Sequence, residues 1–537
     1  MADHVQYYNN DVEQRESLLE HIHDDNGDYG RDNSEAEGTT YEDAIKQTGY
    51  GKFHIFVLIL CGWAVSSDAI EVLSVSFMLP SATCELSLSS SDKGWLNAVI
   101  FIGMLIGGYV WGSLADHYGR RAVLLGSLTV NGLGGLGSSC AQIFWLFLLL
   151  RFISGIGVGG SMPVIFSYFT EFQPKEKRGM MISVLATFWM CGNIIAAGLA
   201  WIIIPLNIGY KSPDFDYDSW RIFVAVCTIP SLTSAAIFVL MPESPKFLLT
   251  KGHGLEALAV MKKVYKTNNP DSREDFKVKK LILTRDKYEK RDGIDLLKID
   301  TRNSWYKIKS SIKLLLHSTV ELFQPPLKRG TIVMLIVNFS LSYGYYGLWM
   351  WFPELFSRVE KYGGSPCESM SAKNQTAGNS TSGVCSKPED WVFFEGFMTA
   401  LSNLPGNLLT IFLMDRVGRK PLLVLSMLAS GVSVFFIPFI HDKIQNLLIS
   451  CLFGAVSTVG WNAIDVLSAE LFPTNVRSTA IGVISGINRV AAILGNITFG
   501  ELVDVHCAIP MLMVAALLTF GGLCSIKLPN TTRKDIH

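Results

Sequence analysis

The sequence contains twelve long apolar stretches in series, and this feature limits the folds that the chain can adopt. A helix needs about 20 mostly apolar residues to cross the hydrocarbon core of a bilayer. The stretches lie at residues 53–79, 94–115, 122–141, 143–169, 180–204, 221–241, 330–352, 391–414, 421–440, 446–469, 478–501 and 508–527. A soluble protein can bury one or two such helices, but not twelve in series. We therefore predict an all-α membrane protein with 12 transmembrane helices.

The composition agrees with this interpretation and divides the chain. Hydrophobic residues make up 49% of the chain and charged residues 17%, whereas soluble proteins carry about 25% charged residues. The predicted segments are an acidic cytosolic tail (1–50), a six-helix bundle (51–241), a cytosolic linker with short helices (242–329), a second six-helix bundle (330–528) and a cytosolic tail (529–537). The first tail has too few apolar clusters to offset the entropy of ordering, so we predict that it is disordered.

Lysine and arginine in the short loops predict the orientation, because cytosolic loops carry an excess of these residues. They gather on the side of both termini: Arg120, Arg121, Lys175, Lys177, Arg178, Arg416, Arg419 and Lys420. We therefore expect cytosolic termini. The far side has one sizeable loop, 353–390, with two N-x-S/T glycan acceptors, Asn374 and Asn379. Cys367 and Cys385 flank them and form a candidate disulfide, which suits an oxidising compartment.

The two halves share motifs at a constant offset, as a duplicated unit would. Asp415 follows Asp116 by 299 residues, and Glu470 follows Glu171 by the same 299 residues. The motif at Asp116 and Asp415 holds a glycine for a tight turn, and both motifs hold arginines that can reach carboxylates of neighbouring helices. We predict that this network gates the cytosolic side, with five residues in each half: Asp116, Gly119, Arg120, Glu171 and Arg178; Asp415, Gly418, Arg419, Glu470 and Arg477.

The chain resembles the sugar-porter branch of the major facilitator superfamily. The resemblance rests on the Gly-Arg loops, on Arg151-x-x-x-Gly155-x-Gly157-x-Gly159-Gly160 and on the Pro242–Leu248 motif Pro-Glu-Ser-Pro-Lys-Phe-Leu. Within that branch it is similar to the synaptic vesicle glycoprotein 2 family, in Gly62–Glu71 and Trp461–Leu467. The resemblance implies two pseudo-symmetric six-helix bundles. The vertebrate family members carry a long lumenal domain between helices seven and eight, and this chain does not.

Charges within the apolar stretches are candidates for function, because they are costly inside a membrane. At 1.5 Å per residue, Asp68 lies about 20 Å and Arg151 about 18 Å from the cytosolic surface. In proton-coupled sugar porters an aspartate pairs with the arginine of this motif. The resemblance therefore implies proton or ion coupling by Asp68 and Arg151, with Glu71 on the same helix face as Asp68. The alternative is that these charges only hold helices together.

A substrate pocket is predicted from aromatic and charged residues at mid-helix positions: Trp189, Tyr345, Tyr346, Trp461, Asp465 and Arg489. Aromatic rings near a carboxylate suit an organic cation, and they also stack on sugars. Arg489 resembles the cavity arginine of organic anion transporters, so the charge of the solute stays open. Sugar porters place paired glutamines where this chain has Ser340 and Ser342, which weakens the case for a sugar.

The sequence shows no enzyme motif, and we expect no cofactor, metal site or nucleic-acid partner. We predict a secondary transporter of a small organic solute in a bilayer, with protons as a candidate coupling ion. The resemblance implies a synaptic or secretory vesicle membrane, and the plasma membrane is the alternative. The rival function is a vesicle protein with a transporter fold that has lost transport and serves as a binding or regulatory partner.

Overall fold

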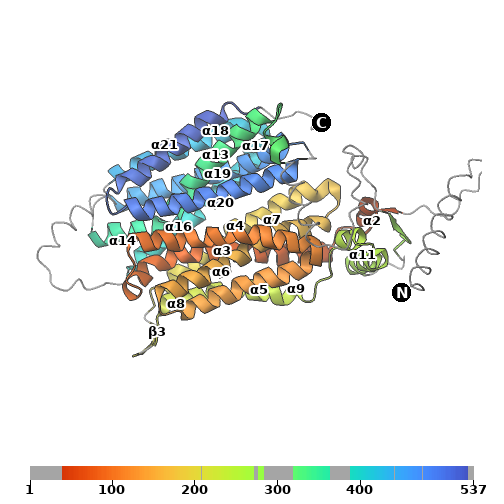
Figure 1. Cartoon of the computed structure of the whole chain (residues 1–537), viewed down its shortest axis with the longest axis horizontal. Helices are drawn as coiled ribbons and strands as arrows, with labels where there is room; N and C mark the ends of the chain where they lie inside the picture. Colours follow the sequence, from red (N-terminus) through yellow and green to blue (C-terminus); the bar gives the residue numbers. More distant parts are fainter. Residues whose placement is uncertain are drawn as a thin grey trace, which may run out of the picture.

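The computed structural model contains two bundles of long helices that lie alongside each other (Figure 1). It describes residues 39–206, 208–213, 215–270, 276–282, 319–362, 388–440, 442–473 and 476–529. The helices of the first bundle are α3 (Lys52–Glu85), α4 (Ser90–Tyr118), α5 (Arg120–Cys140), α6 (Phe144–Glu171), α7 (Lys175–Ile203), α8 (Ser219–Cys227) and α9 (Ile229–Phe238). Helices α8 and α9 together make the sixth crossing. A short antiparallel hairpin, β2 (Tyr210–Ser212) and β3 (Phe215–Tyr217), precedes α8.

The second bundle repeats this plan. Its helices are α13 (Lys328–Trp349), α14 (Phe352–Tyr362), α16 (Asp390–Leu401), α17 (Asn403–Val417), α18 (Arg419–Phe436), α19 (Lys443–Leu471), α20 (Arg477–Leu502) and α21 (Ala508–Ser525), with a 3-10 turn, η2 (Ile437–Phe439), after α18. Helices α16 and α17 form one crossing that is interrupted at Ser402. Helix α14 lies within the segment 353–390 that was predicted to be a loop, so the first part of that loop is helical.

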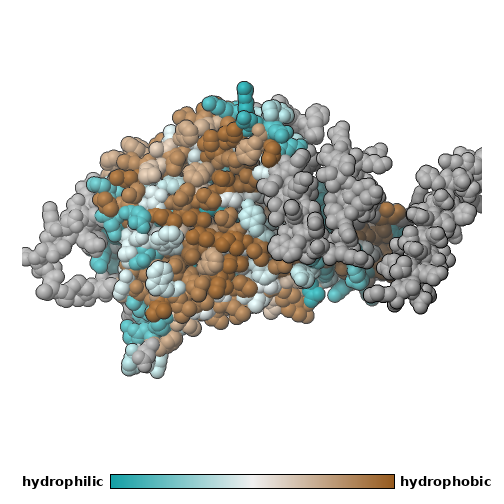
Figure 2. Space-filling view, in the orientation of Figure 1, coloured by the Kyte–Doolittle hydropathy of each residue, from teal (hydrophilic) through white to brown (hydrophobic). Residues whose placement is uncertain are grey.

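The predicted fold class is confirmed. Eleven helical segments of the described chain are long and apolar enough to span a membrane. Helix α5 is the twelfth crossing; its glycines and serines lower its hydropathy, although its 21 residues suffice in length. A space-filling view shows an apolar surface across the middle of the molecule, with hydrophilic residues gathered toward its ends (Figure 2). This surface matches the hydrocarbon core of a bilayer.

The helix ends define two faces of the molecule. The basic face carries the turns at Gly119 and Gly418 together with α2 (Tyr41–Gln47), α10 (Pro245–Thr250) and α11 (Gly254–Asn268). The opposite face carries α14 and the β2–β3 hairpin, at the other end of the bundles (Figure 1).

The tail was predicted to be disordered through residue 50, but its last part is ordered at the basic face. Residues 39–40 (β1) pair in parallel with 281–282 (β4), and α2 follows. Tyr41, Ala44 and Ile45 form an apolar face at helical spacing, which packs with Leu258 and Met261 of the linker. That buried face explains why this stretch folds although the acidic sequence before it led us to predict disorder.

The two halves meet chiefly along three pairs of helices, α4 with α20, α7 with α16, and α3 with α14, and α7 makes a smaller contact with α17. A close backbone approach lies near the opposite face, between Gly94 and Gly500. A Cβ atom on Gly500 would lie 2.8 Å from the Cα of Gly94, so only glycine permits this crossing.

Candidate transport site

Arg151 of α6 pairs with Glu71 of α3, and not with Asp68 as the sequence resemblance implied. The Arg151 Nη1 atom donates to Glu71 Oε1 at 2.5 Å, and both side chains are buried. Ser74 accepts a weaker hydrogen bond from the same nitrogen at 3.3 Å. The face of Phe147 lies 5.2 Å from the guanidinium carbon. The predicted pairing was wrong because Asp68 and Glu71 share one helix face and differ by about 4.5 Å in depth.

Asp68 instead has neutral partners. The Ser161 hydroxyl lies 2.7 Å and 2.9 Å from its two carboxylate oxygens, and Asn131 Nδ2 donates at 3.4 Å. Ser154 lies between Glu71 and Asn131, since its hydroxyl is 2.7 Å from Glu71 Oε1 and 3.0 Å from Asn131 Oδ1. Asp68 is therefore a fully buried carboxylate with no ion-pair partner among the described residues. Asn131 and Ser161 are polar residues within apolar helices, and in the sequence this is the feature that could have identified them as partners of Asp68.

Three of the four predicted pocket aromatics lie together between the halves. Trp461 of α19 makes edge contacts with Tyr345 and Tyr346 of α13, with ring centroids 5.9 Å apart in each case. Tyr346 also contacts Phe101 of α4 at 5.0 Å, so this cluster crosses from one half to the other. Trp189 of α7 packs against the apolar core and, among the described residues, makes no ring contact with the other three.

Asp465 and Arg489 both lie beside this aromatic cluster without an ion pair. Asp465 follows Trp461 by one turn of α19, so it faces the same side, and its side chain is exposed. It makes no hydrogen bond or ion pair with any described residue. Arg489 of α20 reaches the other half, where its Nη2 atom lies 3.9 Å from the sulfur of Met162. Arg489 lies within hydrogen-bonding range of the Tyr346 hydroxyl, and the Asp465 carboxylate is near enough to interact with that hydroxyl electrostatically.

The predicted basic-face residues form matching ion pairs within each half. Arg120 Nε lies 3.3 Å from Glu171 Oε1, and its equivalent Arg419 Nε lies 3.3 Å from Glu470 Oε1. Asp116 also pairs with Arg120 at 3.3 Å, whereas the Asp415 side chain lies outside the described residues. The repeat seen in the sequence is thus present as a repeated contact.

The turns and the second arginines of these motifs differ in their surroundings. Gly119 and Gly418 adopt φ of 102° and 98°, where other residues are strained. Arg178 binds Glu42 of α2 at 3.1 Å, whereas its equivalent Arg477 donates to the Phe472 carbonyl at 3.1 Å. These contacts join neighbours within a half or the tail, so a role in gating stays a prediction.

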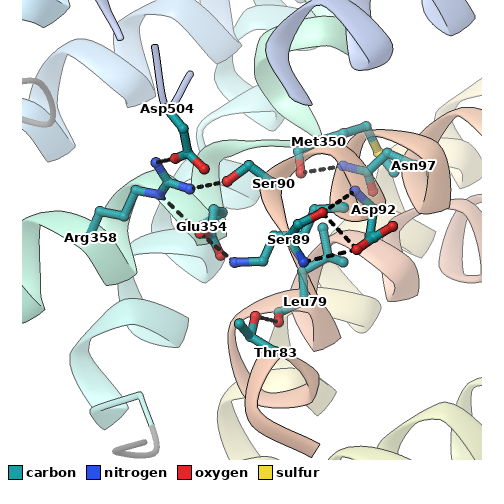
Figure 3. A network of polar contacts seen from close by, with 11 residues as sticks. Leu79, Thr83, Ser89, Ser90, Asp92, Asn97, Met350, Glu354, Arg358 and Asp504 are labelled. Carbon is teal, nitrogen blue, oxygen red and sulfur yellow. Dashed lines mark hydrogen bonds and ion pairs between the residues drawn. The ribbon is translucent and has the colours of Figure 1, made fainter. Parts of the chain in front are cut away.

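A buried charge network joins the halves at the opposite face (Figure 3). Lys93 of α4 donates to Glu354 of α14 at 2.7 Å, and Arg358 donates to the same oxygen at 2.9 Å. Arg358 also binds Asp504 at 2.9 Å and the Ser90 hydroxyl at 2.8 Å. Burial alone would raise the pKa of Glu354, but Lys93 and Arg358 outweigh it and lower that pKa below its usual value.

This network could not be predicted from the sequence, because each member stands near a helix end, where charged residues are common. Two further hydrogen bonds join the halves near this network, because the Met350 carbonyl accepts from Ser76 at 2.7 Å and from Asn97 at 3.4 Å. In the described residues, the inter-half hydrogen bonds away from the opposite face are long, from Asn407 to Thr187 at 3.4 Å and from Arg489 to the Met162 sulfur at 3.9 Å. The halves are therefore held together at the opposite face and only loosely toward the basic face.

The predicted glycan acceptors, Asn374 and Asn379, and the predicted disulfide partners, Cys367 and Cys385, lie outside the described residues. Cys84, at the end of α3, and Cys507, before α21, each take part in a disulfide bond, and both lie at the opposite face.

Comparisons with known proteins agree with this architecture. A family model for "Sugar (and other) transporter" matches residues 35–328, and a model for "Major Facilitator Superfamily" matches residues 395–536. The structure of the xylose transporter XylE from E. coli in a partially occluded inward open conformation has a TM-score of 0.64. It is 18% identical in sequence, and the match covers 90% of this chain and 100% of that chain. At this identity the likeness shows the fold alone.

Sequence comparison gives nearer relatives. Synaptic vesicle glycoprotein 2C of Rattus norvegicus is 32% identical, over 91% of this chain and 80% of its own length. Synaptic vesicle glycoprotein 2A of Homo sapiens is 32% identical, over 91% of this chain and 79% of its own length. The chain therefore belongs to the sugar-porter family of the major facilitator superfamily, together with the synaptic vesicle glycoproteins 2.

Proposed function

We propose that the chain is a secondary active transporter, which moves a small organic solute across a membrane by alternating access and is coupled to protons. The observation that carries this proposal is the uneven contact between the halves. They are joined by buried charges at the opposite face, while Asp465 and Arg489 stand unpaired between them, nearer the middle. An arrangement with one closed end and a polar site midway is what alternating access requires.

Asp68 is the proposed site of proton coupling. A buried carboxylate without a cation is costly in its ionised form, and its hydroxyl and amide partners compensate only in part. A change of conformation that alters these contacts would therefore change its affinity for a proton. Glu71 is less suited to this role, because Arg151 neutralises it directly.

Uptake into liposomes with an imposed pH gradient tests this proposal. The wild type should take up its solute faster with the gradient than without it. Asp68→Asn mimics the protonated acid, so it should abolish gradient-driven uptake and keep exchange of solute in the absence of a gradient. Asn131→Ser is the matched control, since it removes one neutral partner and keeps the carboxylate. Full proton-driven uptake by Asp68→Asn would contradict the assignment, and saturable binding without uptake by the wild type would favour a regulatory protein.

We further propose that the basic face is cytosolic and that the protein resides in a vesicle membrane. The basic loops and the disulfide-bonded Cys84 and Cys507 at the other face support the orientation, because disulfides form in oxidising compartments. The named relatives support the vesicle. Surface staining of intact cells would instead indicate the plasma membrane.

The orientation predicts glycosylation at the opposite face. Glycosidase treatment of protein from animal cells should increase its gel mobility, since each N-linked glycan is a bulky addition. Replacing Asn374 and Asn379 together with Gln should give the same mobility without treatment. Asn530→Gln, at a sequon in the tail that is predicted to be cytosolic, is the control and should leave the shift intact. A wild type that does not respond to the glycosidase would contradict the orientation or the acceptor assignment.

A further inference from the structure

Two charged side chains beside the aromatic cluster bear on the charge of the solute, provided that the protein is the transporter proposed above. Asp465 and Arg489 belong to the same half, on α19 and α20, but they do not form an ion pair with each other. Neither forms an ion pair with any other described residue. Arg489 lies within hydrogen-bonding range of the Tyr346 hydroxyl, and Asp465 lies one helical turn from Trp461, whose ring contacts Tyr346, so both charges border one region beside the aromatic cluster.

This region faces the other half and not the lipid. Asp465 shares its helix face with Trp461, whose ring contacts Tyr346, and Tyr346 contacts Phe101 of the other half. Arg489 approaches Met162 of the other half directly. The Nε1 atom of Trp461 is buried and has no hydrogen-bond partner among the described residues.

The free-energy cost of leaving these two opposite charges unpaired differs between the open and the occluded state. In the open state water can solvate both of them. When the halves close and expel that water, each charge needs a partner, because a buried unpaired charge is strongly unfavourable. A neutral solute would leave both charges unpaired, and a singly charged solute would leave one. A solute that carries one cationic and one anionic group would pair with both.

Asp68 is the competing partner for Arg489, since its charge acts on Arg489 across the halves. Its carboxylate is already bound by Ser161 and Asn131 within its own half, and it forms no ion pair with Arg489. We propose that the region between α19, α20 and α13 binds a zwitterionic solute with an aromatic or similar flat body. The cationic group of the solute pairs with Asp465, its anionic group pairs with Arg489, and its body packs on Tyr346 and Trp461.

Four probes that share one indole body test this proposal: tryptophan (both charges), tryptophanamide (cation only), N-acetyltryptophan (anion only) and N-acetyltryptophanamide (neutral). Binding to the purified full-length protein is measured by calorimetry, and unfolding of each ligand-free variant is checked first. Tryptophan should bind at least tenfold more tightly than either singly charged probe, and the neutral probe should bind weakest. A tenfold ratio corresponds to the loss of one charge-assisted contact.

Two variants assign the charges. Asp465→Asn should remove the advantage of tryptophan over N-acetyltryptophan, and Arg489→Gln should remove its advantage over tryptophanamide. The controls, Glu256→Gln and Arg416→Gln, change exposed charges at the basic face and should preserve the wild-type order. The proposal is overturned if the wild type binds tryptophanamide as tightly as tryptophan. It is also overturned if Arg489→Gln leaves the ratio of these two affinities unchanged, because Arg489 would then interact with Asp68 and not with the solute. Binding of none of the four probes also overturns it, while proton-driven uptake of another solute would leave the transporter proposal standing.

Discussion

Replacing Arg151 with methionine should destabilise the protein by about 3–5 kcal/mol, the usual cost of removing one partner of a buried ion pair. The substitution leaves Glu71 charged, almost fully buried and with a hydrogen bond from Ser154 as compensation. It also removes the contact of the guanidinium with the Phe147 ring. Thermal unfolding of the detergent-solubilised protein measures the loss, together with the yield of folded protein.

A second substitution removes the unpaired charge of Glu71. Glu71→Gln combined with Arg151→Met should recover most of the lost stability, because no unpaired charge is left in the core. Arg416→Met is the matched control, since Arg416 is exposed at the basic face and should change stability little. If the double variant unfolds as readily as Arg151→Met alone, the pair is not the source of the loss.

The helices could be predicted from the sequence because the bilayer imposes a length and a polarity on each of them. The Gly-Arg motifs could be predicted as well, because a duplicated unit repeats its contacts at a fixed offset. Arg120–Glu171 and Arg419–Glu470 show this directly, with the same pair of atom types at 3.3 Å in each half. In both cases the signal is regular along the chain.

The details of the site could be predicted only in part, because they depend on which side of a helix meets its neighbour. Counting residues gives a depth, but it cannot decide between Asp68 and Glu71 as the partner of Arg151, one turn apart. The opposite-face network is harder still to predict. Lys93 and Glu354 are separated by 261 residues, and each stands near a helix end where charges are common. Helix α2 was not predicted because its apolar face consists of only three residues.

Replacing Glu354 with glutamine should open the opposite face. Glu354 binds both Lys93 and Arg358, and the Lys93 and Glu354 side chains are each 6% exposed. The substitution leaves a buried lysine without its counter-ion, which costs about 3–5 kcal/mol in the closed state. The lysine regains water when the halves separate there. A shift of 3 kcal/mol changes the ratio of closed to open molecules by roughly a hundredfold, at 1.4 kcal/mol for each factor of ten.

Hydrogen–deuterium exchange of residues 86–97 and 350–361 measures this opening, because their amides lie at the joined ends of the halves. Both segments should exchange faster in Glu354→Gln. Glu501→Gln is the matched control, since Glu501 also crosses between the halves, to Ser91 at 2.5 Å, but through an exposed contact. Unchanged exchange in Glu354→Gln would mean that the apolar contacts and the Gly94–Gly500 crossing suffice to hold this face closed.

The same network should be insensitive to mild acid. The pKa of Glu354 is lowered in the folded protein, so its contribution to stability is complete above the ordinary glutamate pKa of about 4.3. It is lost only as the pH falls through the lower folded-state value. Exchange of residues 350–361 in the wild type, corrected for the intrinsic pH dependence, should therefore be equal at about pH 7 and about pH 5.5. Faster corrected exchange at the lower pH would show that another titrating group keeps the halves together at this face. The ion pairs of Glu354 would then not be what keeps it closed.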